Sequence, residues 1–207
     1  MSRCVIIGGA EINDFSVVRE YLKAGDYNIF CDSGLSHMEK LGIKADLIVG
    51  DFDSHEKPDT DVETIVLPCE KDDTDTVYAV KEALRRGFDE FLMLGVIGQR
   101  LDHTLGNLSI LLMLDSLEKR GMIVDDYSEI EIVSREPVFI EDKYAYFSIL
   151  SLDGSAKGVT VENAKYPLSD AVITYDFQYG ISNEVLPGMT AKISVKDGRL
   201  LLIKIRK

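Results

Sequence analysis

The stretch DLIVGDFDSH, residues 46–55, joins a short apolar run to two aspartates, Asp51 and Asp53. Such a run is typical of a buried strand in a parallel sheet. Carboxylates are costly to desolvate and repel one another when close, so water or a cation must reach this pair. Their i, i+2 spacing in extended chain puts both on one side, which favours a Mg²⁺ site. The alternative is a turn in which the aspartates only accept backbone N–H groups.

Around this stretch, apolar runs of strand length alternate with segments of helical period. We expect strands at 3–9, 27–32, 46–50, 62–68, 90–96 and 122–126, and helices at 14–25, 33–42, 72–87 and 101–121. Asn13 or Asp14 should cap the first helix, and Gly25 should end it. Short, nearly all-apolar strands between helices predict a mostly parallel sheet with helices on both faces, a Rossmann-like α/β architecture.

The pattern changes near residue 128. Short alternating segments separated by Gly, Pro and Asp-Gly turns predict strands at 128–134, 136–141, 143–152, 157–164, 170–177, 184–187, 189–198 and 199–207. This arrangement is typical of an antiparallel β-sandwich or barrel. The charge changes at the same place: residues 1–129 hold 13 Lys and Arg against 26 Asp and Glu, whereas residues 130–207 hold 10 of each. We therefore expect an α/β domain at 1–127 and a β-sandwich domain at 128–207.

Composition excludes several classes of protein. The 207 residues are 45% hydrophobic and 29% charged, as in soluble globular proteins, and no apolar run reaches the roughly 18–20 residues of a membrane span. The N-terminus has too short an apolar region for a signal peptide, so we expect a cytoplasmic protein. Cys4, Cys31 and Cys69 are odd in number and widely spaced, which argues against disulfides or zinc. Cys4 and Cys31 lie in predicted strands, which favours buried thiols. A net charge of −13 repels nucleic acid and anionic membranes, and it repels a nucleoside triphosphate unless divalent metal mediates the contact.

Ligands of open parallel sheets bind beyond the carboxyl ends of the strands, so the segments that follow the predicted strands are the candidates. In KDDTD, residues 71–75, Asp75 is our choice for a third metal ligand and Lys71 faces phosphate. Helix capping by Asp72, Asp73 or Thr74 is an equally good interpretation.

The segment GVIGQRLDH, residues 95–103, also follows a predicted strand. Its glycines allow phosphate to approach backbone N–H groups, and Arg100 can clamp phosphate oxygens. The spacing is not that of a Walker A loop. The alternative is a tight turn with Asp102 as helix N-cap. By itself His103 is more often a structural helix residue than a catalyst, as are His37 and His55.

The second half offers YDFQYGISNEV, residues 175–185. Tyr175, Phe177 and Tyr179 alternate along the expected strand, which usually indicates core or a cross-strand stack. The polar turn at 180–183 next to them also suits a flat heterocycle.

Together the motifs CDSG (31–34), DLIVGDFDS (46–54), KDDTD (71–75), GQRLDHTLGN (98–107), KYPL (165–168) and GISNE (180–184) resemble those of the thiamine pyrophosphokinase (thiamine diphosphokinase) family. The resemblance implies a homodimer that transfers diphosphate from ATP to the hydroxyl of thiamine, with Mg²⁺, giving thiamine diphosphate and AMP. It also implies that the α/β domain is catalytic and binds nucleotide and Mg²⁺, and that the sandwich binds thiamine and dimerises.

The resemblance assigns roles to individual residues. Asp51, Asp53 and Asp75 match the metal-binding carboxylates and count as catalytic together with Arg100 and Asp102. The expected nucleotide-binding residues are Asp32, Gly34, Lys71, Asp72, Thr74, Gly98, Gln99 and His103. Ser182 and Asn183 match the segment that meets the thiamine pyrimidine. Because Val185 stands where relatives often have an aromatic residue and the chain lacks Trp, we expect Tyr179 or another aromatic residue to stack on thiamine.

Three other functions remain open. Asp51 and Asp53 partly imitate the nucleophile strand of haloacid-dehalogenase-type phosphatases, but His55 stands where Thr or Val is expected and the strand is third in the chain. A diphosphokinase acting on a pterin is the second, although KYPL and GISNE favour thiamine. The third is a thiamine- or nucleotide-binding module without chemistry. Whether Asp102 is a base or a ligand is also open.

Overall fold

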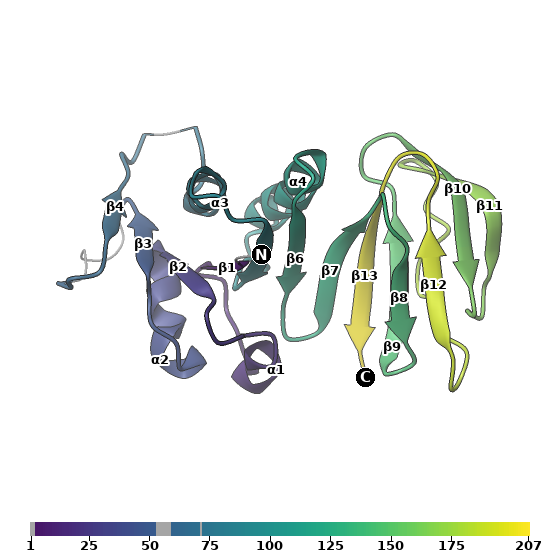
Figure 1. Ribbon diagram of the computed structural model, residues 1–207, viewed down its shortest axis with the longest axis horizontal. Helices are drawn as coiled ribbons and strands as arrows, with labels where there is room; N and C mark the ends of the chain where they lie inside the picture. Colours follow the sequence, from purple (N-terminus) through teal and green to yellow (C-terminus); the bar gives the residue numbers. More distant parts are fainter. Residues whose placement is uncertain (1–2, 53–58, 71) are drawn as a thin grey trace. The chain divides into compact units, whose positions relative to one another are not determined.

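The computed structural model describes residues 3–52, 59–70 and 72–207, so Asp53, His55 and Lys71 lie outside the described residues. The chain divides into two compact units, Met1–Asp126 and Tyr127–Lys207 (Figure 1). Within the described ranges, no helix has the length and apolar character needed to cross a membrane.

Unit 1 is an α/β fold. Its sheet has the order β4-β3-β2-β1-β5-β6, and all of these pairs are parallel. The strands are β1 (Arg3–Ile7), β2 (Tyr27–Cys31), β3 (Leu47–Gly50), β4 (Thr64–Val66), β5 (Glu90–Leu94) and β6 (Arg120–Val124). The helices are α1 (Phe15–Arg19), the 3₁₀ helix η1 (Asp32–His37), α2 (Met38–Leu41), α3 (Asp75–Arg85) and α4 (Leu101–Ser116). The predicted mostly parallel sheet is confirmed.

Helices cover both faces of this sheet because its strands are apolar on both sides. On one face, Val5, Phe30 and Leu92 form a buried cluster with Val18 of α1 and Leu41 of α2. Figure 1 shows α3 and α4 on the other side of the sheet from α1 and α2. Cys4 and Cys31 are buried in β1 and β2, as expected.

Asp14 caps α1, since its carboxylate accepts the backbone N–H groups of Ser16 and Val17. The expectation that this helix continues to Gly25 is wrong, because α1 ends at Arg19. The carboxylate of Asp26 accepts the Lys23 backbone N–H at 2.7 Å and also binds the Arg3 guanidinium, and these bonds favour a turn after the helix.

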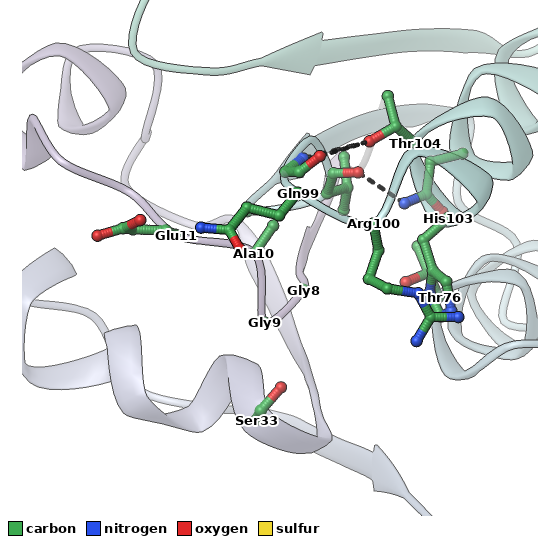
Figure 2. A pocket seen from close by; sticks show the side chains of 14 residues that line it. Gly8, Gly9, Ala10, Glu11, Ser33, Thr76, Gln99, Arg100, His103 and Thr104 are labelled. Carbon is green, nitrogen blue, oxygen red and sulfur yellow. Dashed lines mark hydrogen bonds between the residues drawn. The ribbon is translucent and has the colours of Figure 1, made fainter.

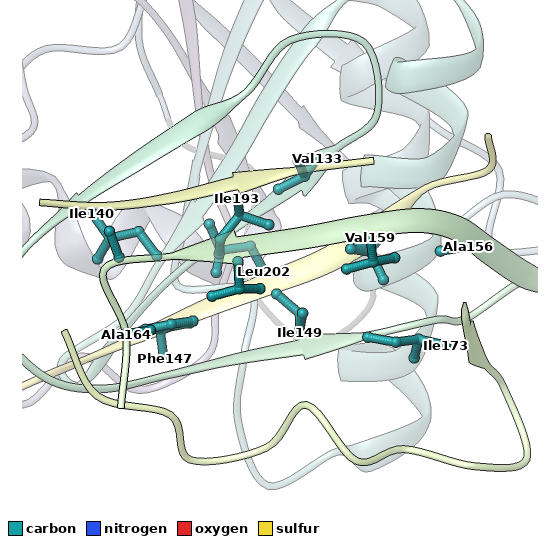
Figure 3. Packing of buried hydrophobic residues seen from close by; sticks show 13 residues of the cluster. Val133, Ile140, Phe147, Ile149, Ala156, Val159, Ala164, Ile173, Ile193 and Leu202 are labelled. Atoms are coloured by element: carbon teal, nitrogen blue, oxygen red, sulfur yellow. The ribbon is translucent and has the colours of Figure 1, made fainter. Parts of the chain in front are cut away.

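Unit 2 is an antiparallel sandwich, as predicted. One sheet has the order β7-β13-β9 and the other β11-β10-β12-β8. The strands are β7 (Ser128–Val133), β8 (Val138–Glu141), β9 (Tyr144–Leu150), β10 (Ser155–Glu162), β11 (Leu168–Thr174), β12 (Thr190–Ser194) and β13 (Leu200–Arg206). Buried side chains from both sheets, such as Phe147, Ile193 and Leu202, form the core (Figure 3).

One strand prediction in unit 2 is wrong, and another predicted strand, 170–177, extends three residues too far. Residues 184–187 form no strand, and Val185 makes only an isolated bridge with Ala164; Pro187 has no N–H group for a longer ladder. Strand β11 ends at Thr174, whose carbonyl accepts the Phe177 N–H in a turn. The rings of Phe177 and Tyr179 are tilted against each other with 5.3 Å between centroids, yet both are exposed, so the core interpretation of these aromatics is wrong.

A buried ion-pair cluster lies on β7 and β13. The ammonium of Lys204 is 2.8 Å from a carboxylate oxygen of Glu129 and 2.9 Å from one of Glu131. The Tyr144 hydroxyl also donates to Glu129. In the ladder Lys204 is opposite Glu129, and Leu202 is opposite Glu131. Side chains two residues apart on a strand point to the same face, so these charged groups lie on the face that carries the core residue Leu202.

A second network fixes the end of α3. Glu82 is buried and accepts hydrogen bonds from Arg85 at 2.6 and 2.8 Å and from Arg86 at 2.7 Å. Arg86 also donates to Glu63 and to the Tyr27 hydroxyl. Hydrogen bonds from Arg85 lead the causes that lower the pKa of Glu82 to about 2, against an ordinary value of 4.5.

Glu82→Gln should therefore lower the free energy of unfolding at pH 7 by roughly 1.5–3 kcal/mol, the usual contribution of hydrogen bonds to charged groups. Because the folded-state pKa is depressed, this stabilisation is present above pH 4.5 and is lost as the pH falls towards about 2. Urea denaturation at pH 7 and pH 3 measures it. If the free energies of unfolding of wild type and variant differ by the same amount at both pH values, the ionised Glu82 carboxylate does not supply this stabilisation.

Candidate functional site

The strand order of unit 1 reverses between β1 and β5, because β2, β3 and β4 extend the sheet to one side and β6 to the other. Ligands of open α/β sheets bind at such a switch point. A pocket of about 370 Å³ lies there (Figure 2), and it is lined by Gly8, Gly9, Ala10, Glu11, Ser33, Thr76, Gly95, Val96, Gly98, Gln99, Arg100, His103, Thr104 and Asn107.

Glycines bring the loops after β1, β2 and β5 into backbone contact. A Cβ on Gly8 would lie 2.5 Å from the carbonyl oxygen of Gly95, and one on Gly34 would lie 2.4 Å from that of Ile7. A Cβ on Gly9 would lie 1.8 Å from the Ser33 hydroxyl oxygen. Gly95 also has a φ of +60°, which other residues rarely adopt. Backbone atoms of these loops therefore form much of the pocket wall, where an anion can meet N–H groups.

Two polar side chains of α4 hold the loop before it. The Thr104 hydroxyl accepts the Gly98 N–H at 3.2 Å, and the buried Asn107 amide donates to the Val96 carbonyl at 2.7 Å. Neither residue was predicted from the sequence. Their i, i+3 spacing on one helix face, immediately after a glycine-containing loop, is the signal that identifies them.

Arg100 and Asp102 form a bidentate pair, with N–O distances of 3.0 and 2.6 Å. Both side chains are exposed, and the hydrogen bonds from Arg100 hold the pKa of Asp102 well below its usual range. The interpretation of Asp102 as N-cap is wrong: Arg100 occupies that position and Asp102 is the second residue of α4. Of the predicted nucleotide-binding residues, Gly98, Gln99 and His103 line the pocket beside Arg100.

The predicted carboxylates follow neighbouring strands. Asp32 comes directly after β2 and Asp51 directly after β3, and the pairing of these strands brings Asp32 against Gly50, where a Cβ would lie 3.1 Å from that of Asp32. Asp32 and Phe52 have φ values of 39° and 53°, in the left-handed region that non-glycine residues seldom adopt.

Asp75 is the first residue of α3, and its backbone carbonyl accepts from the buried Cys31 thiol at 3.7 Å. No three His, Cys, Asp or Glu side chains gather as a metal site within 3–52, 59–70 and 72–207. The metal set Asp51, Asp53 and Asp75 stays a prediction, since Asp53 is outside these ranges.

The rest of the segment 72–75 is consistent with capping. Thr74 is the N-cap of α3, because its hydroxyl accepts the Val77 N–H at 3.3 Å. Asp73 forms an ion pair with Lys81 at 2.7 Å, and Asp72 is exposed.

In unit 2 the segment 180–183 lies along β9. Phe147 and Asn183 exchange backbone hydrogen bonds of 2.9 and 2.8 Å, and the Ile149 N–H donates to the Gly180 carbonyl at 2.9 Å. Ser182 has a φ of 58°, and its N–H donates to the Ser148 hydroxyl at 3.0 Å. The segment predicted as a polar turn is therefore held against β9 by backbone hydrogen bonds, and Ser182 in it is exposed.

Asn183, in the GISNE motif (180–184), is hydrogen-bonded to Tyr166 in the KYPL motif (165–168). Its buried side chain accepts the N–H groups of Tyr166 and Glu184, at 3.0 and 2.9 Å, and donates to the Tyr166 carbonyl at 2.8 Å. Lys165 and Glu184 form an ion pair of 2.7 Å beside it. Tyr166 itself is exposed, and the exposed Tyr179 donates its hydroxyl to the Val172 carbonyl at 2.9 Å. The amide of Asn183 is thus mainly engaged within the protein.

We expect Gly8→Ala to lower the free energy of unfolding by more than about 2 kcal/mol, because its methyl group would overlap the Gly95 carbonyl. Gly106 in α4 is the matched control. Within the described part of the chain, a methyl group added there meets no atom within 4 Å beyond its own stretch of helix. Gly106→Ala should raise stability by roughly 0.5–1 kcal/mol through helix propensity. Chemical denaturation measures both, and equal values for the two variants contradict the close approach of the loops.

Asn183→Ala should destabilise the protein by about 1–3 kcal/mol, because the Tyr166 N–H and carbonyl lose their side-chain partner. Ser182→Ala should change stability by less than roughly 0.5 kcal/mol, as at other exposed positions. Thermal unfolding of the two variants distinguishes these effects; a stable Asn183→Ala variant contradicts the structural role of the amide.

Comparison with known proteins agrees with the two-unit fold. Residues 18–124 match the family model described as "Thiamin pyrophosphokinase, catalytic domain", and residues 129–200 match "Thiamin pyrophosphokinase, vitamin B1 binding domain". The thiamine pyrophosphokinase of Bacillus subtilis is 27% identical over 207 residues, with 96% of each chain covered.

Solved structures show the same fold. The Bacillus subtilis thiamine pyrophosphokinase structure has a TM-score of 0.87 at 23% identity, with both chains fully covered. A thiamin pyrophosphokinase family protein from Enterococcus faecalis has a TM-score of 0.82 at 25% identity, again with 100% of each chain covered. These findings confirm the resemblance drawn from the sequence motifs. The chain belongs to the thiamin pyrophosphokinase family of enzymes.

Proposed function

We propose that this protein transfers the diphosphate group of ATP to the hydroxyl of thiamine, giving thiamine diphosphate and AMP in a Mg²⁺-dependent reaction. The observation that carries the proposal is the glycine-walled pocket at the β1/β5 switch point, in a chain whose two halves match the two family models. Switch-point pockets with backbone N–H groups and an arginine suit a polyphosphate.

In this proposal the pocket of unit 1 binds ATP. Arg100 lines the pocket with an exposed guanidinium, so it is available to phosphate oxygens. Gly98, Gln99 and His103 contact the nucleotide from the same wall, and Asp32, Gly34, Lys71, Asp72 and Thr74 complete the proposed nucleotide-binding set.

Mg²⁺ is part of the proposal, with Asp51, Asp53 and Asp75 as its ligands. The donor chemistry fits, because carboxylate oxygens are the ligands that Mg²⁺ takes in addition to water and substrate phosphates. When bound, Mg²⁺ neutralises charge on the triphosphate. An excess of acidic residues in this half of the chain makes such neutralisation necessary for an anionic substrate.

The proposed reaction is attack of the thiamine hydroxyl on the β-phosphorus of ATP, with AMP as leaving group. Positioning of the two substrates supplies much of the rate of such a transfer. The pair with Arg100 and the lowered pKa make Asp102 a weak proton acceptor, which favours a role in orienting Arg100 over one as general base.

Thiamine is assigned to unit 2, where Ser182 and Tyr179 are exposed next to the buried Asn183. The bonds of Asn183 favour an indirect role, in which it holds the segment around Tyr166 for the substrate. Homodimerisation through unit 2 and a cytoplasmic location are further parts of this proposal; the first derives from the family resemblance and the second from the sequence.

The decisive assay incubates the protein with ATP, Mg²⁺ and thiamine and follows products by phosphorus NMR. We expect AMP to form only when thiamine is present, with the diphosphate attached to thiamine. Phosphate and ADP released without thiamine would instead show a phosphatase or ATPase, and thiamine binding without turnover would show a binding module.

Asp51→Asn should lower turnover by roughly 100-fold or more while leaving the fold intact, because it removes a proposed metal ligand at a strand end. Asp170→Asn is the charge-matched control: Asp170 is an exposed residue of unit 2 with a φ of 51°, which Asn tolerates. The same assay and circular dichroism measure both variants. Normal activity of Asp51→Asn refutes the metal assignment.

A further inference from the structure

His37 is a buried polar residue outside the set of site residues predicted from the sequence. It is the last residue of η1, the helix that begins at Asp32. Its Nε2 lies 2.9 Å from the carbonyl oxygen of Ala10, and its ring lies 5.7 Å from that of Phe15 in α1. The imidazole therefore joins the segment after β2 to the segment after β1.

Ala10 is the residue on which three loops of the pocket converge. Its N–H donates to the Gly95 carbonyl at 2.8 Å, and a Cβ on Gly98 would lie 2.9 Å from that of Ala10. Figure 2 shows Ala10 next to Gly9 and Glu11 at the wall of the pocket. The carbonyl of Ala10 takes its hydrogen bond from His37, so this bond and the Gly95 bond fix both sides of one residue.

The imidazole suits this task in its neutral form. Burial is the largest cause of the lowered pKa of His37; the hydrogen bond to the Ala10 carbonyl acts in the opposite direction, and Lys40 again acts against the charged form. A neutral ring with its proton on Nε2 donates to the Ala10 carbonyl, which accepts only. Without the donor, this carbonyl would lose a side-chain partner at the edge of the pocket.

We propose that His37 is a positioning residue of the nucleotide pocket: its Nε2–H holds the Ala10 carbonyl, and thereby sets the wall that the loops after β1 and β5 present to ATP. His37 acts through Ala10 and does not touch the nucleotide. The identity of the ligand rests on the proposed function; the positioning of the loop does not.

Two substitutions separate the hydrogen bond from the packing of the ring. His37→Phe keeps an aromatic ring against Phe15 and removes the donor, whereas His37→Gln keeps an N–H donor at similar reach and removes the ring. Isothermal titration of the full chain with Mg²⁺-ATP, without thiamine, measures nucleotide affinity. We expect His37→Phe to bind roughly three- to tenfold more weakly, the equivalent of one hydrogen bond, and His37→Gln to bind within about twofold of wild type.

Amide hydrogen exchange of the ligand-free protein supplies a readout that does not depend on nucleotide. The Ala10 N–H should exchange faster in His37→Phe than in wild type and remain protected in His37→Gln, because the donor restrains Ala10. Glu82→Gln is the control for a general loss of stability. It alters the end of α3 and none of the pocket residues, so it should leave ATP affinity and Ala10 protection unchanged.

Three outcomes overturn the inference. If wild type binds Mg²⁺-ATP and His37→Phe binds it equally well, His37 does not position the pocket, while the proposed function stands. If His37→Gln binds Mg²⁺-ATP more weakly than His37→Phe does, packing of the ring and not the hydrogen bond determines nucleotide affinity. If wild type does not bind Mg²⁺-ATP, the proposed function fails, and the role of His37 in nucleotide binding fails with it.

Discussion

The backbone contact between the loops after β1 and β5 is the constraint on which the rest of the site depends. Gly8 and Gly95 approach so closely that a side chain on either would overlap the other's carbonyl group. This approach is possible because β1 pairs with β5, at the point where the strand order of the sheet reverses. Where the two loops meet, the Ala10 N–H donates to the Gly95 carbonyl and the Ala10 carbonyl accepts from His37. Gly98, on the segment that leads to α4, lies close to the Ala10 side chain. The pocket is therefore shaped mainly by main chain, which packs densely and deforms little.

Polar side chains in this site serve two purposes. Thr104, Asn107 and His37 bind main-chain groups and fix the course of the loops. Arg100 and Asp102 instead lie exposed, paired with each other, and remain accessible to a ligand. A rigid wall combined with an accessible charged pair is the arrangement that favours preorganised binding of an anion, because little side-chain or loop entropy is lost on binding.

The sequence predicts the fold well and the site only in part. Apolar runs such as 3–9 and 90–96 identify the strands, and the change near residue 128 identifies the sandwich, because these signals are local. Which strands pair is not local: β1 and β5 are far apart in the chain, so the contact of Gly8 with Gly95 could not be derived from either segment. Asn183 shows the same difficulty, because its amide bonds Tyr166, a residue whose proximity depends on the sandwich topology. Alternation was also a misleading signal at 175–179, where a turn at Thr174 leaves the aromatics exposed.

The Lys204 cluster of unit 2 has a consequence for how the sandwich avoids misfolding. Its charges lie on the core face of β7 and β13, where Lys204 pairs with Glu129 and lies diagonal to Glu131. A slip of one residue between the two strands would place Lys204 on the opposite face of the sheet from its two glutamates, since side chains alternate along a strand. Strand β13 carries apolar residues on both faces, so its apolar side chains alone oppose such a slip only weakly. A buried charge left without its counter-ion is costly, so the cluster disfavours a one-residue slip between these two strands.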